Sequence, residues 1–269
     1  MTKPTDNRVA SDVIDGLLID IDGVLTVSWE PIDGAPAALA TVRRSGLPLR
    51  FATNTTTRTR AEVAELLTEA GMPTAVEEIL TAPAATAAHL RRHHAGARVF
   101  LLNTGDLTAD LQGIDLVEDG PADVVVIGGA GVDFTHRQLN EAFRLILDGA
   151  AFVAMHCNLY WRTRGGLELD TGAYVRALQA ATGVEPVVLG KPSPDFFAAG
   201  VAELGCAPDR VAMVGDDLDN DVLGAQHAGL HGILVRTGKF RPEVLDASDE
   251  RPDVVIDSFA DLPGLLGVG

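Results

Sequence analysis

Short apolar runs alternate with helical patterns along most of the chain. The runs are continuous and do not alternate with polar residues, which is typical of strands buried on both faces of a parallel sheet. They cover Leu17–Ile21, Leu47–Ala52, Val99–Leu102, Val124–Ile127, Ala151–Met155, Pro186–Leu189, Val211–Val214, Gly232–Val235 and Val254–Ile256. Strands that alternate with helices predict repeated strand–helix–strand units, and hence an α/β fold.

Two of the intervening helices have clear boundaries in the sequence. One carries apolar residues at i, i+3, i+4 and i+7, namely Val63, Leu66, Leu67 and Ala70. Thr59 and Glu62 are spaced as a capping box at its start, and Gly71 is placed to end it. For the second helix, Ser193 and Pro194 predict the N-cap and the first helical position.

Composition narrows the class of protein. The 269 residues include 38 acidic and 21 basic side chains, giving a formal net charge of −17, and only three lysines. A protein that binds nucleic acid or an anionic membrane surface needs clustered basic residues. The composition therefore excludes both kinds of partner. Two cysteines are too few for a disulfide framework. The sequence has no signal-peptide pattern and no apolar run of spanning length, so we expect a cytoplasmic protein.

Two aspartates follow the first predicted strand directly. Asp20 and Asp22 stand one residue apart before Gly23, at the carboxyl end of a strand, where parallel sheets bind ligands. Two crowded carboxylates repel unless a cation or a proton intervenes. The pair fits a magnesium-assisted site in which one aspartate attacks and the other handles a proton. Taken alone, the same residues favour an ordinary Asp-Gly turn after a strand.

Polar residues also follow three other predicted strands. Thr53 and Asn54 begin a cluster suited to phosphate oxygens or to an ordinary turn, and Lys191 stands at another strand end, where solvation is its default. After Val211–Val214 come four carboxylates in six residues, namely Asp216, Asp217, Asp219 and Asp221. Helix capping explains one or two of these, whereas a hard divalent cation explains more. The complementary chemistry of all four strand ends favours one shared site.

In this order, the four motifs resemble those of the haloacid dehalogenase superfamily of phosphohydrolases. The segments LLIDIDGVLT, RFATNTTT, VVLGKPSPDFF, VAMVGDDLDNDVLGAQHAGL and VRTGKF are similar to the class IIA, NagD-like branch. Within it, they resemble the group of phospholysine phosphohistidine inorganic pyrophosphate phosphatase and its hydrolase-domain-containing relatives. The resemblance implies a Rossmann-like parallel-sheet core, residues 1–82 and 183–269, with an inserted α/β cap at 83–182.

The resemblance also implies roles for the motif residues. Asp20 would be the nucleophile that forms an aspartyl-phosphate, and Asp22 the general acid and then the base. Thr53 and Asn54 would hold the phosphoryl oxygens, and Lys191 would neutralise the nucleophile and the phosphate. Asp216 would bind Mg²⁺ together with Asp20 and the backbone carbonyl of Asp22. Asp217 and Asp221 would support the metal from close by.

The cap should recognise the leaving group, because the core handles only the phosphoryl group. Aromatic and cationic residues gather at 156–164, in a chain with only two Trp and two Tyr. We name five residues as candidate substrate contacts: His156, Asn158, Tyr160, Trp161 and Arg162. The same segment equally fits a surface hairpin whose aromatic residues pack against the cap.

The predicted function is a Mg²⁺-dependent phosphatase of a small phosphorylated metabolite. The alternative is a phospho-accepting signalling domain, or a protein that binds phosphate without catalysis. Receiver domains also combine an acidic pocket, a Thr or Ser and a Lys in that order. Gly23, Asp216 with Asp217, and the length of the chain favour the enzyme. The expected partner is a small phosphorylated substrate. The resemblance also allows a homodimer formed through the cap.

Overall fold

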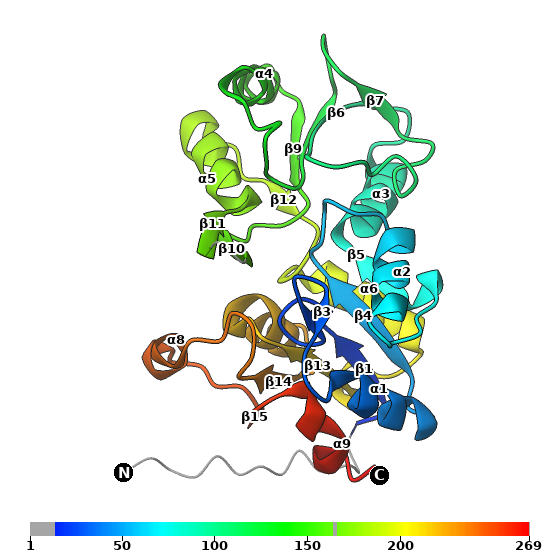
Figure 1. Cartoon of the computed structure of the whole chain (residues 1–269). Helices are drawn as coiled ribbons and strands as arrows, with labels where there is room; N and C mark the ends of the chain where they lie inside the picture. The colour runs from blue at the N-terminus through cyan, green and yellow to red at the C-terminus, as the bar shows by residue number, and fades with distance from the viewer. Residues whose placement is uncertain (1–13, 164–165, 269) are drawn as a thin grey trace. The chain divides into compact units, whose positions relative to one another are not determined.

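The computed structural model of the protein describes residues 14–163 and 166–268 (Figure 1). Their contacts divide into two compact units. The first unit comprises the described residues up to Thr53, together with Val63–Leu80 and those from Pro194 onward. The second comprises Asn54–Glu62 and Thr81–Ser193.

The first unit is built on a six-stranded sheet. Its order is β15-β14-β13-β1-β4-β5, and the pairings from β15 through to β4 are parallel. The strands are β1 (Gly16–Ile19), β4 (Leu49–Thr53), β5 (Ile79–Thr81), β13 (Val211–Gly215), β14 (His231–Val235) and β15 (Val254–Ile256). The helices are α1 (Ala35–Arg44), α2 (Arg60–Glu69), α6 (Pro194–Leu204), α7 (Gly224–His227), α8 (Pro242–Ala247) and α9 (Leu262–Leu265). With β1 central and fully buried, residues that follow this strand are held on a rigid support.

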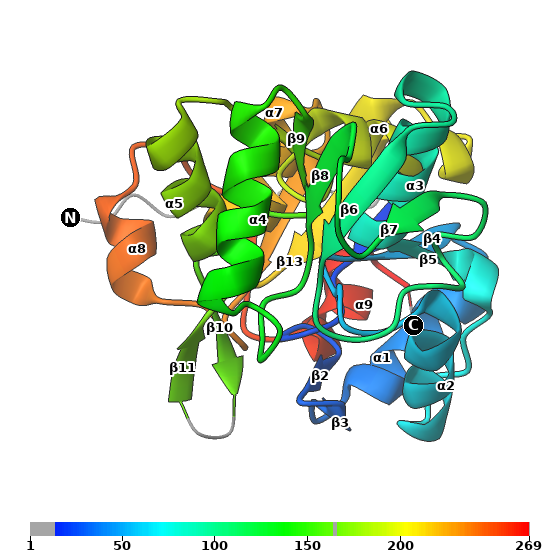
Figure 2. The same cartoon turned by 90° about the horizontal axis from the view of Figure 1, so that it is seen from above.

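The second unit has its own five-stranded parallel sheet, in the order β12-β9-β8-β6-β7. Its strands are β6 (Arg98–Leu102), β7 (Asp115–Val117), β8 (Val124–Ile127), β9 (Ala151–Ala154) and β12 (Val187–Val188). Its helices are α3 (Ala82–His93), α4 (His136–Leu147) and α5 (Thr171–Thr182). Figure 2 shows α4 and α5 side by side. An antiparallel hairpin, β10 (Tyr160–Thr163) and β11 (Gly166–Leu169), precedes α5.

Alternation along β8 explains how this second sheet is covered on both faces. Val125 and Ile127 pack into a cluster with residues of α4 and α5. Val124 and Val126 join a different cluster, which includes residues of α3. Because successive strand residues point to opposite faces, a run of four apolar residues serves two cores at once.

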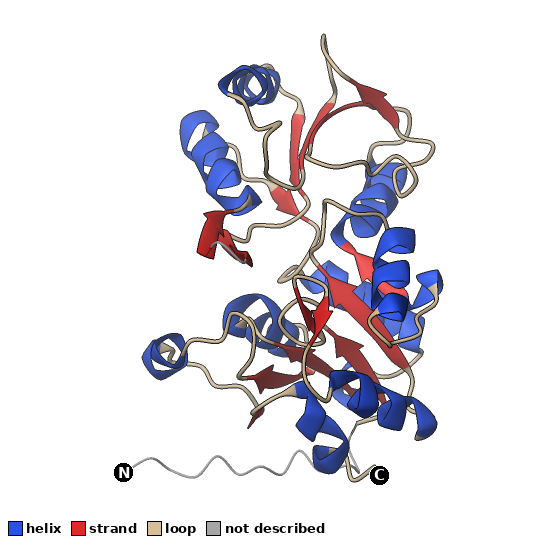
Figure 3. Ribbon diagram, viewed as in Figure 1, coloured by secondary structure: helices blue, strands red, loops and turns tan. Residues whose placement is uncertain are grey.

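The remaining regular elements are short. They are β2 (Thr26–Val27), β3 (Glu30–Pro31), η1 (Val76–Glu78), η2 (Pro208–Arg210), η3 (Leu218–Leu223) and η4 (Phe259–Asp261). The turn η3 is π-helical, whereas η1, η2 and η4 are 3₁₀ turns. Figure 3 shows the strands and helices of both units. No helix among the described residues is long and apolar enough to cross a membrane.

The predicted α/β fold with parallel, Rossmann-like sheets is confirmed. Each of the nine apolar runs contains a strand, with boundaries shifted by at most two residues. The helix at Arg60–Glu69 begins at a true capping box, since the Thr59 main-chain N–H donates to Glu62 Oε2 at 2.8 Å and the Glu62 N–H donates to Thr59 Oγ1 at 3.3 Å. The second predicted helix begins at Pro194 as expected.

Candidate active site

Three neighbouring strands of the first unit end at the same edge of their sheet. Asp216 follows β13, Asp20 follows β1, and Thr53 is the last residue of β4. All three side chains are buried. The edge where the strands end is the usual ligand-binding edge of a parallel sheet, so the polar residues predicted at these strand ends do occupy one edge.

A cluster of three buried carboxylates stands at this edge. One oxygen from each of Asp20, Asp216 and Asp221 lies within 4.8 Å of the other two. Asp221 reaches the cluster from the π-helical turn η3, where its Oδ2 accepts a 3.2 Å hydrogen bond from the Asp217 N–H. Gly215 makes room for it, because a Cβ at that position would lie 2.2 Å from the Cβ of Asp221.

The cluster has the properties of a cation site. Oδ1 of Asp216 is buried and has no hydrogen-bond partner among the described residues. Burial, together with repulsion from Asp20 and Asp221, raises the pKa of Asp216 well above its usual value, against the opposing attraction of Lys239. Buried carboxylates facing one another are costly unless a cation compensates them. Three carboxylates with one oxygen left unpartnered therefore fit a hard divalent cation, which prefers oxygen ligands.

The loop after β14 encloses Asp216 from a second side. The main-chain N–H of Lys239 donates to Asp216 Oδ2 at 2.6 Å, and Thr237 Oγ1 donates to the carbonyl of Gly23 at 2.5 Å. Gly23 (φ +91°) and Gly238 (φ +61°) leave room for this carboxylate, since a Cβ on them would lie 1.9 and 2.0 Å from Oδ2. Asp216 is thus held by the loop through Oδ2, while its buried Oδ1 has no hydrogen-bond partner among the described residues.

Lys239 is a component of the site for which the sequence predicts no role, although it stands in the segment VRTGKF. Burial would lower the pKa of its ammonium, but attraction by Asp216 and then by Asp217, Asp20 and Asp221 raises the pKa above its usual range. Its scarcity, as one of three lysines, was the available signal.

Two of the predicted carboxylates do not join the cluster. Asp22 is half-buried and is not among the three grouped residues. The carboxylate of Asp217 caps η3 by accepting from the N–H of Asn220 at 3.0 Å and from its Nδ2 at 2.9 Å. The structure therefore groups Asp221 with Asp20 and Asp216, and turns the carboxylate of Asp217 to Asn220.

Asn54 and Lys191 lie together in the second unit. The Lys191 N–H donates to Asn54 Oδ1, and Asn54 Nδ2 donates to the Lys191 carbonyl, each at 2.9 Å. Lys191 is only 2% exposed. Asn54 directly follows Thr53 in the chain. Two residues that are 137 positions apart are therefore joined by a two-point pairing.

The candidate cap contacts differ in exposure. His156 and Asn158 are buried, Tyr160 is half-buried, and Trp161 is 43% exposed. Tyr160, Trp161 and Arg162 belong to β10 of the hairpin, opposite Leu169, Glu168 and Leu167. The side chain of Arg162 lies outside the described part of the chain. The predicted surface hairpin exists, and substrate contact by these residues stays a prediction.

Parallel Rossmann-like sheets with a buried carboxylate cluster at the strand ends define an α/β enzyme with a site suited to a divalent cation. Residues 17–117 match the model of the haloacid dehalogenase-like hydrolase family, and residues 188–262 match a second model of HAD-hydrolase-like proteins. The chain belongs to the haloacid dehalogenase-like hydrolase family and is a phosphohydrolase of that superfamily.

Individual relatives support this assignment over nearly the full length. The chain is 37% identical to haloacid dehalogenase-like hydrolase domain-containing protein 2 of Bos taurus, covering 90% of this chain and 92% of that protein. It is 34% identical to the phospholysine phosphohistidine inorganic pyrophosphate phosphatase of Homo sapiens, covering 98% and 97%. The solved structure of 4-nitrophenylphosphatase from Thermotoga maritima matches with a TM-score of 0.87 and 28% identity, covering 94% and 98%. NagD from E. coli K-12 matches with a TM-score of 0.82 and 27% identity, covering 93% and 98%.

Proposed function

We propose that the protein is a Mg²⁺-dependent phosphatase that hydrolyses a small phosphorylated metabolite through an aspartyl-phosphate on Asp20. The observation that carries the proposal is the buried cluster of Asp20, Asp216 and Asp221 at the carboxyl ends of β1 and β13. A phosphohydrolase needs a nucleophile and compensation of charge at one point. Asp20 can supply the first, and a cation held by these carboxylates can supply the second.

In the first step, a carboxylate oxygen of Asp20 attacks phosphorus while the bond to the leaving oxygen breaks. Asp22 donates its carboxyl proton to that leaving oxygen. Thr53 and Asn54 are proposed to serve the phosphoryl oxygens, Thr53 by direct contact and Asn54 through Lys191, whose positive charge balances the phosphate. Asp22 stands outside the cluster of three carboxylates, so its proton can serve the leaving group.

In the second step, water attacks phosphorus of the aspartyl-phosphate and the bond to Asp20 breaks. Asp22, now a carboxylate, accepts the proton of the water. Inorganic phosphate leaves, and the carboxylate of Asp20 is restored. Asp20 gains the phosphoryl group in the first step and releases it in the second, and Asp22 loses one proton and regains one, so the cycle balances.

Asp20, Asp216 and the backbone carbonyl of Asp22 are proposed to hold Mg²⁺, with Asp217 and Asp221 in support. When bound, Mg²⁺ supplies positive charge that reduces the repulsion between the Asp20 carboxylate and the phosphoryl oxygens. Asp221 supports the site through its position in the cluster, and Asp217 through its N–H bond to Asp221.

The cap is proposed to comprise residues 83–182, inserted into a core of residues 1–82 and 183–269. Its proposed role is to recognise the leaving group of the substrate. This range falls inside the second compact unit. We propose a cytoplasmic location, and a homodimer formed through the cap. The candidate contacts are His156, Asn158, Tyr160, Trp161 and Arg162.

The proposed function is tested by a panel of phosphorylated metabolites assayed with and without Mg²⁺. The panel should include 4-nitrophenyl phosphate, pyrophosphate and a phosphorylated lysine, which are suggested by the names of the relatives. We expect multiple turnovers of phosphate release that depend on the added cation. A stable phosphoprotein without turnover would instead support the phospho-accepting alternative.

Removal of the cation is expected to abolish activity and to lower the thermal denaturation midpoint. Mg²⁺ binds the folded cluster but not the unfolded chain, so at a concentration 100 times its Kd it adds about 2.7 kcal/mol to the free energy of unfolding. Calorimetry after chelation and after return of Mg²⁺ measures this difference.

The matched pair Asp221→Asn and Asp219→Asn checks that the cluster is responsible. Both residues lie in η3, but Asp219 is exposed and outside the cluster. Asp221→Asn should lose most of the stabilisation by Mg²⁺, and Asp219→Asn should keep it. Equal stabilisation in the two variants would remove Asp221 from the proposed site.

Replacing Asp22 by Ala is expected to slow turnover by roughly 10²–10⁴-fold, as for loss of a general acid or base. Nitrophenolate leaves readily without a proton, so the variant should lose less of its first step with 4-nitrophenyl phosphate than with an alkyl phosphate. Rapid mixing should then show a burst of one nitrophenolate per enzyme before slow turnover. An unchanged steady-state rate with alkyl phosphates would exclude Asp22 from this role.

A further inference from the structure

The side-chain amide of Asn54 forms two hydrogen bonds with the main chain of Lys191. Oδ1 accepts from the Lys191 N–H and Nδ2 donates to the Lys191 carbonyl, both at 2.9 Å. A planar carboxamide with a donor on one side and an acceptor on the other matches the two main-chain groups of a single residue. Such a two-point pairing fixes both the position and the orientation of that residue.

Glycine at position 190 permits this close pairing. A Cβ on Gly190 would lie 2.5 Å from Asn54 Oδ1 and 2.5 Å from the carbonyl oxygen of Met155. Either distance is too short for a side chain without displacement of its neighbour. The main chain before Lys191 is therefore shaped to receive the carboxamide of Asn54.

Asn158 supports the amide of Asn54 from the other side. Its Oδ1 accepts from Asn54 Nδ2 in a longer contact of 3.4 Å, and its own side chain is buried. The Asn158 carbonyl accepts from the N–H of Gly172 at 2.8 Å, and its N–H donates to His156 Nδ1 at 3.3 Å. The main chain of Asn158 is thus held by the start of α5 and by a buried imidazole, and its buried side chain reaches Asn54 from this fixed position.

We propose that Asn54 is a positioning residue, whose side chain orients Lys191 and does not itself bind the phosphoryl group. Both hydrogen-bonding ends of its carboxamide are already used by Lys191, and the second proton of Nδ2 faces Asn158. These two bonds fix the main chain of the buried Lys191, and thereby the direction in which its side chain leaves the main chain toward an anion. The inference deepens the proposed function and rests on it only for the anion that Lys191 binds.

The three lysines of the chain allow a direct spectroscopic test. Labelling the full-length protein with ¹⁵N-lysine yields main-chain amide signals from Lys3, Lys191 and Lys239 alone, and Lys191→Arg identifies the signal of Lys191 by its loss. Asn54→Ala should shift the Lys191 amide signal and speed its hydrogen exchange at least tenfold. The Lys239 amide, which donates to Asp216, should stay unchanged as an internal reference.

Asn103→Ala is the matched control. Asn103 follows β6 in the same unit, and its carboxamide also pairs with main-chain groups, those of Gly129, Thr104 and Gly105. Its loss should leave the Lys191 signal in place. Asn54→Asp provides a near-isosteric variant, which keeps the acceptor for the Lys191 N–H and removes the donor to its carbonyl. Its exchange rate should fall between those of the wild type and Asn54→Ala.

A double-mutant cycle separates positioning from direct binding of the anion. Inorganic phosphate is the probe, with its affinity measured by calorimetry in the presence of Mg²⁺. If Asn54 acts through Lys191, Asn54→Ala weakens binding in the wild type but has no further effect in a Lys191→Met background. Additive losses would overturn the proposal, since they require a separate contact between Asn54 and phosphate.

The two proposals fail in different ways. An unshifted Lys191 amide with unchanged exchange in Asn54→Ala overturns the positioning role, even if the enzyme turns over normally. The opposite outcome is that Asn54→Ala loses protection of the Lys191 amide while the wild-type protein hydrolyses no phosphorylated compound. That result would support the positioning role and would overturn only the proposed phosphatase activity. The amide measurement needs no substrate, so it reads the pairing itself.

Discussion

Asp20→Asn is expected to reduce phosphate release to the background rate. Asparagine has nearly the same shape as aspartate, but its amide is a poor nucleophile for phosphorus, so the aspartyl-phosphate cannot form. Loss of a nucleophile typically lowers kcat by at least about 10⁴-fold. The measurement is phosphate release by the purified variant, with the most active substrate of the metabolite panel, at saturating Mg²⁺.

The stability of the same variant serves as its control. Asp20 is one of three clustered carboxylates, and its charge contributes to raising the pKa of Asp216. Removing that charge relieves repulsion in the metal-free protein, so its denaturation midpoint should be equal to or above that of the wild type. A folded, stable variant that still releases phosphate at the normal rate would exclude Asp20 as the nucleophile.

Gly238→Ala is expected to weaken Mg²⁺ binding at least tenfold, which corresponds to about 1.4 kcal/mol. An alanine Cβ at this position would lie 2.0 Å from Asp216 Oδ2 and 2.4 Å from the Cα of Gly23. The carboxylate must then move, and its hydrogen bond from the Lys239 N–H must lengthen or break. Isothermal titration with Mg²⁺ measures the affinity, and phosphate release should fall with it.

Gly46→Ala isolates this steric effect from backbone strain. Both glycines have positive φ, +61° at Gly238 and +79° at Gly46, but nothing lies within 4 Å of a Cβ at Gly46. Each substitution therefore carries a left-handed backbone cost of about 1–2 kcal/mol, and only Gly238→Ala displaces Asp216. Equal Mg²⁺ affinity in the two variants would show that the loop does not control the orientation of Asp216.

The sequence allowed most of the fold to be predicted, because parallel strands buried on both faces are continuous in their hydrophobicity. The strands that escaped prediction are short or lie at edges. β5 and β7 have three residues each, and β2 and β3 have two, and none of the four consists of a continuous apolar run as the predicted strands do. The β10–β11 hairpin was foreseen only as an alternative interpretation, since its aromatic residues also suited a binding segment.

The positions of the polar residues at the strand ends were predictable once the strands were, because the end of a strand fixes where the next residue lies. The choice between Asp217 and Asp221 was not, because η3 is a π-helical turn whose wider winding brings Asp221 back to Gly215. The loop at Gly238 and Lys239 acts on Asp216 through a main-chain N–H, and main-chain donors carry no signature in the residue types. The pairing of Asn54 with Lys191 likewise depends on the approach of segments distant in the sequence.

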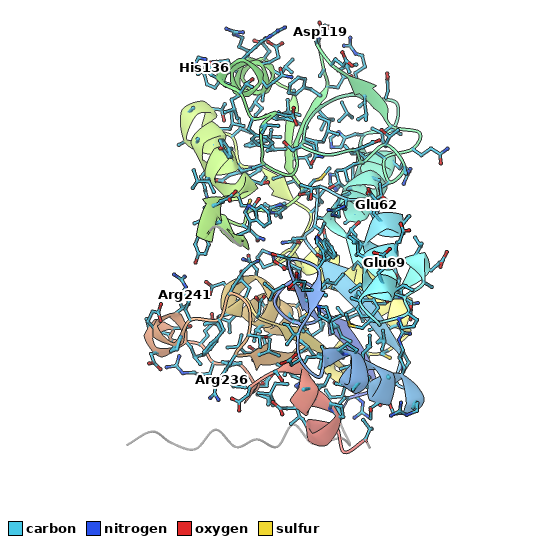
Figure 4. All side chains as sticks on the ribbon, viewed as in Figure 1. Glu62, Glu69, Asp119, His136, Arg236 and Arg241 are labelled. Carbon is cyan, nitrogen blue, oxygen red and sulfur yellow. The ribbon has the colours of Figure 1, made fainter. Side chains whose placement is uncertain are left out.

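The edge strand β7 has a consequence for how copies of the protein behave in solution. Asp115 in β7 and the next two residues after the strand, Glu118 and Asp119, are exposed, and Asp119 lies at the tip of the loop that follows (Figure 4). An edge strand offers main-chain groups to which another chain can add, and nearby like charges oppose that addition. The acidic surplus therefore has a use at this edge, because it disfavours the addition of a strand from a second copy of the chain.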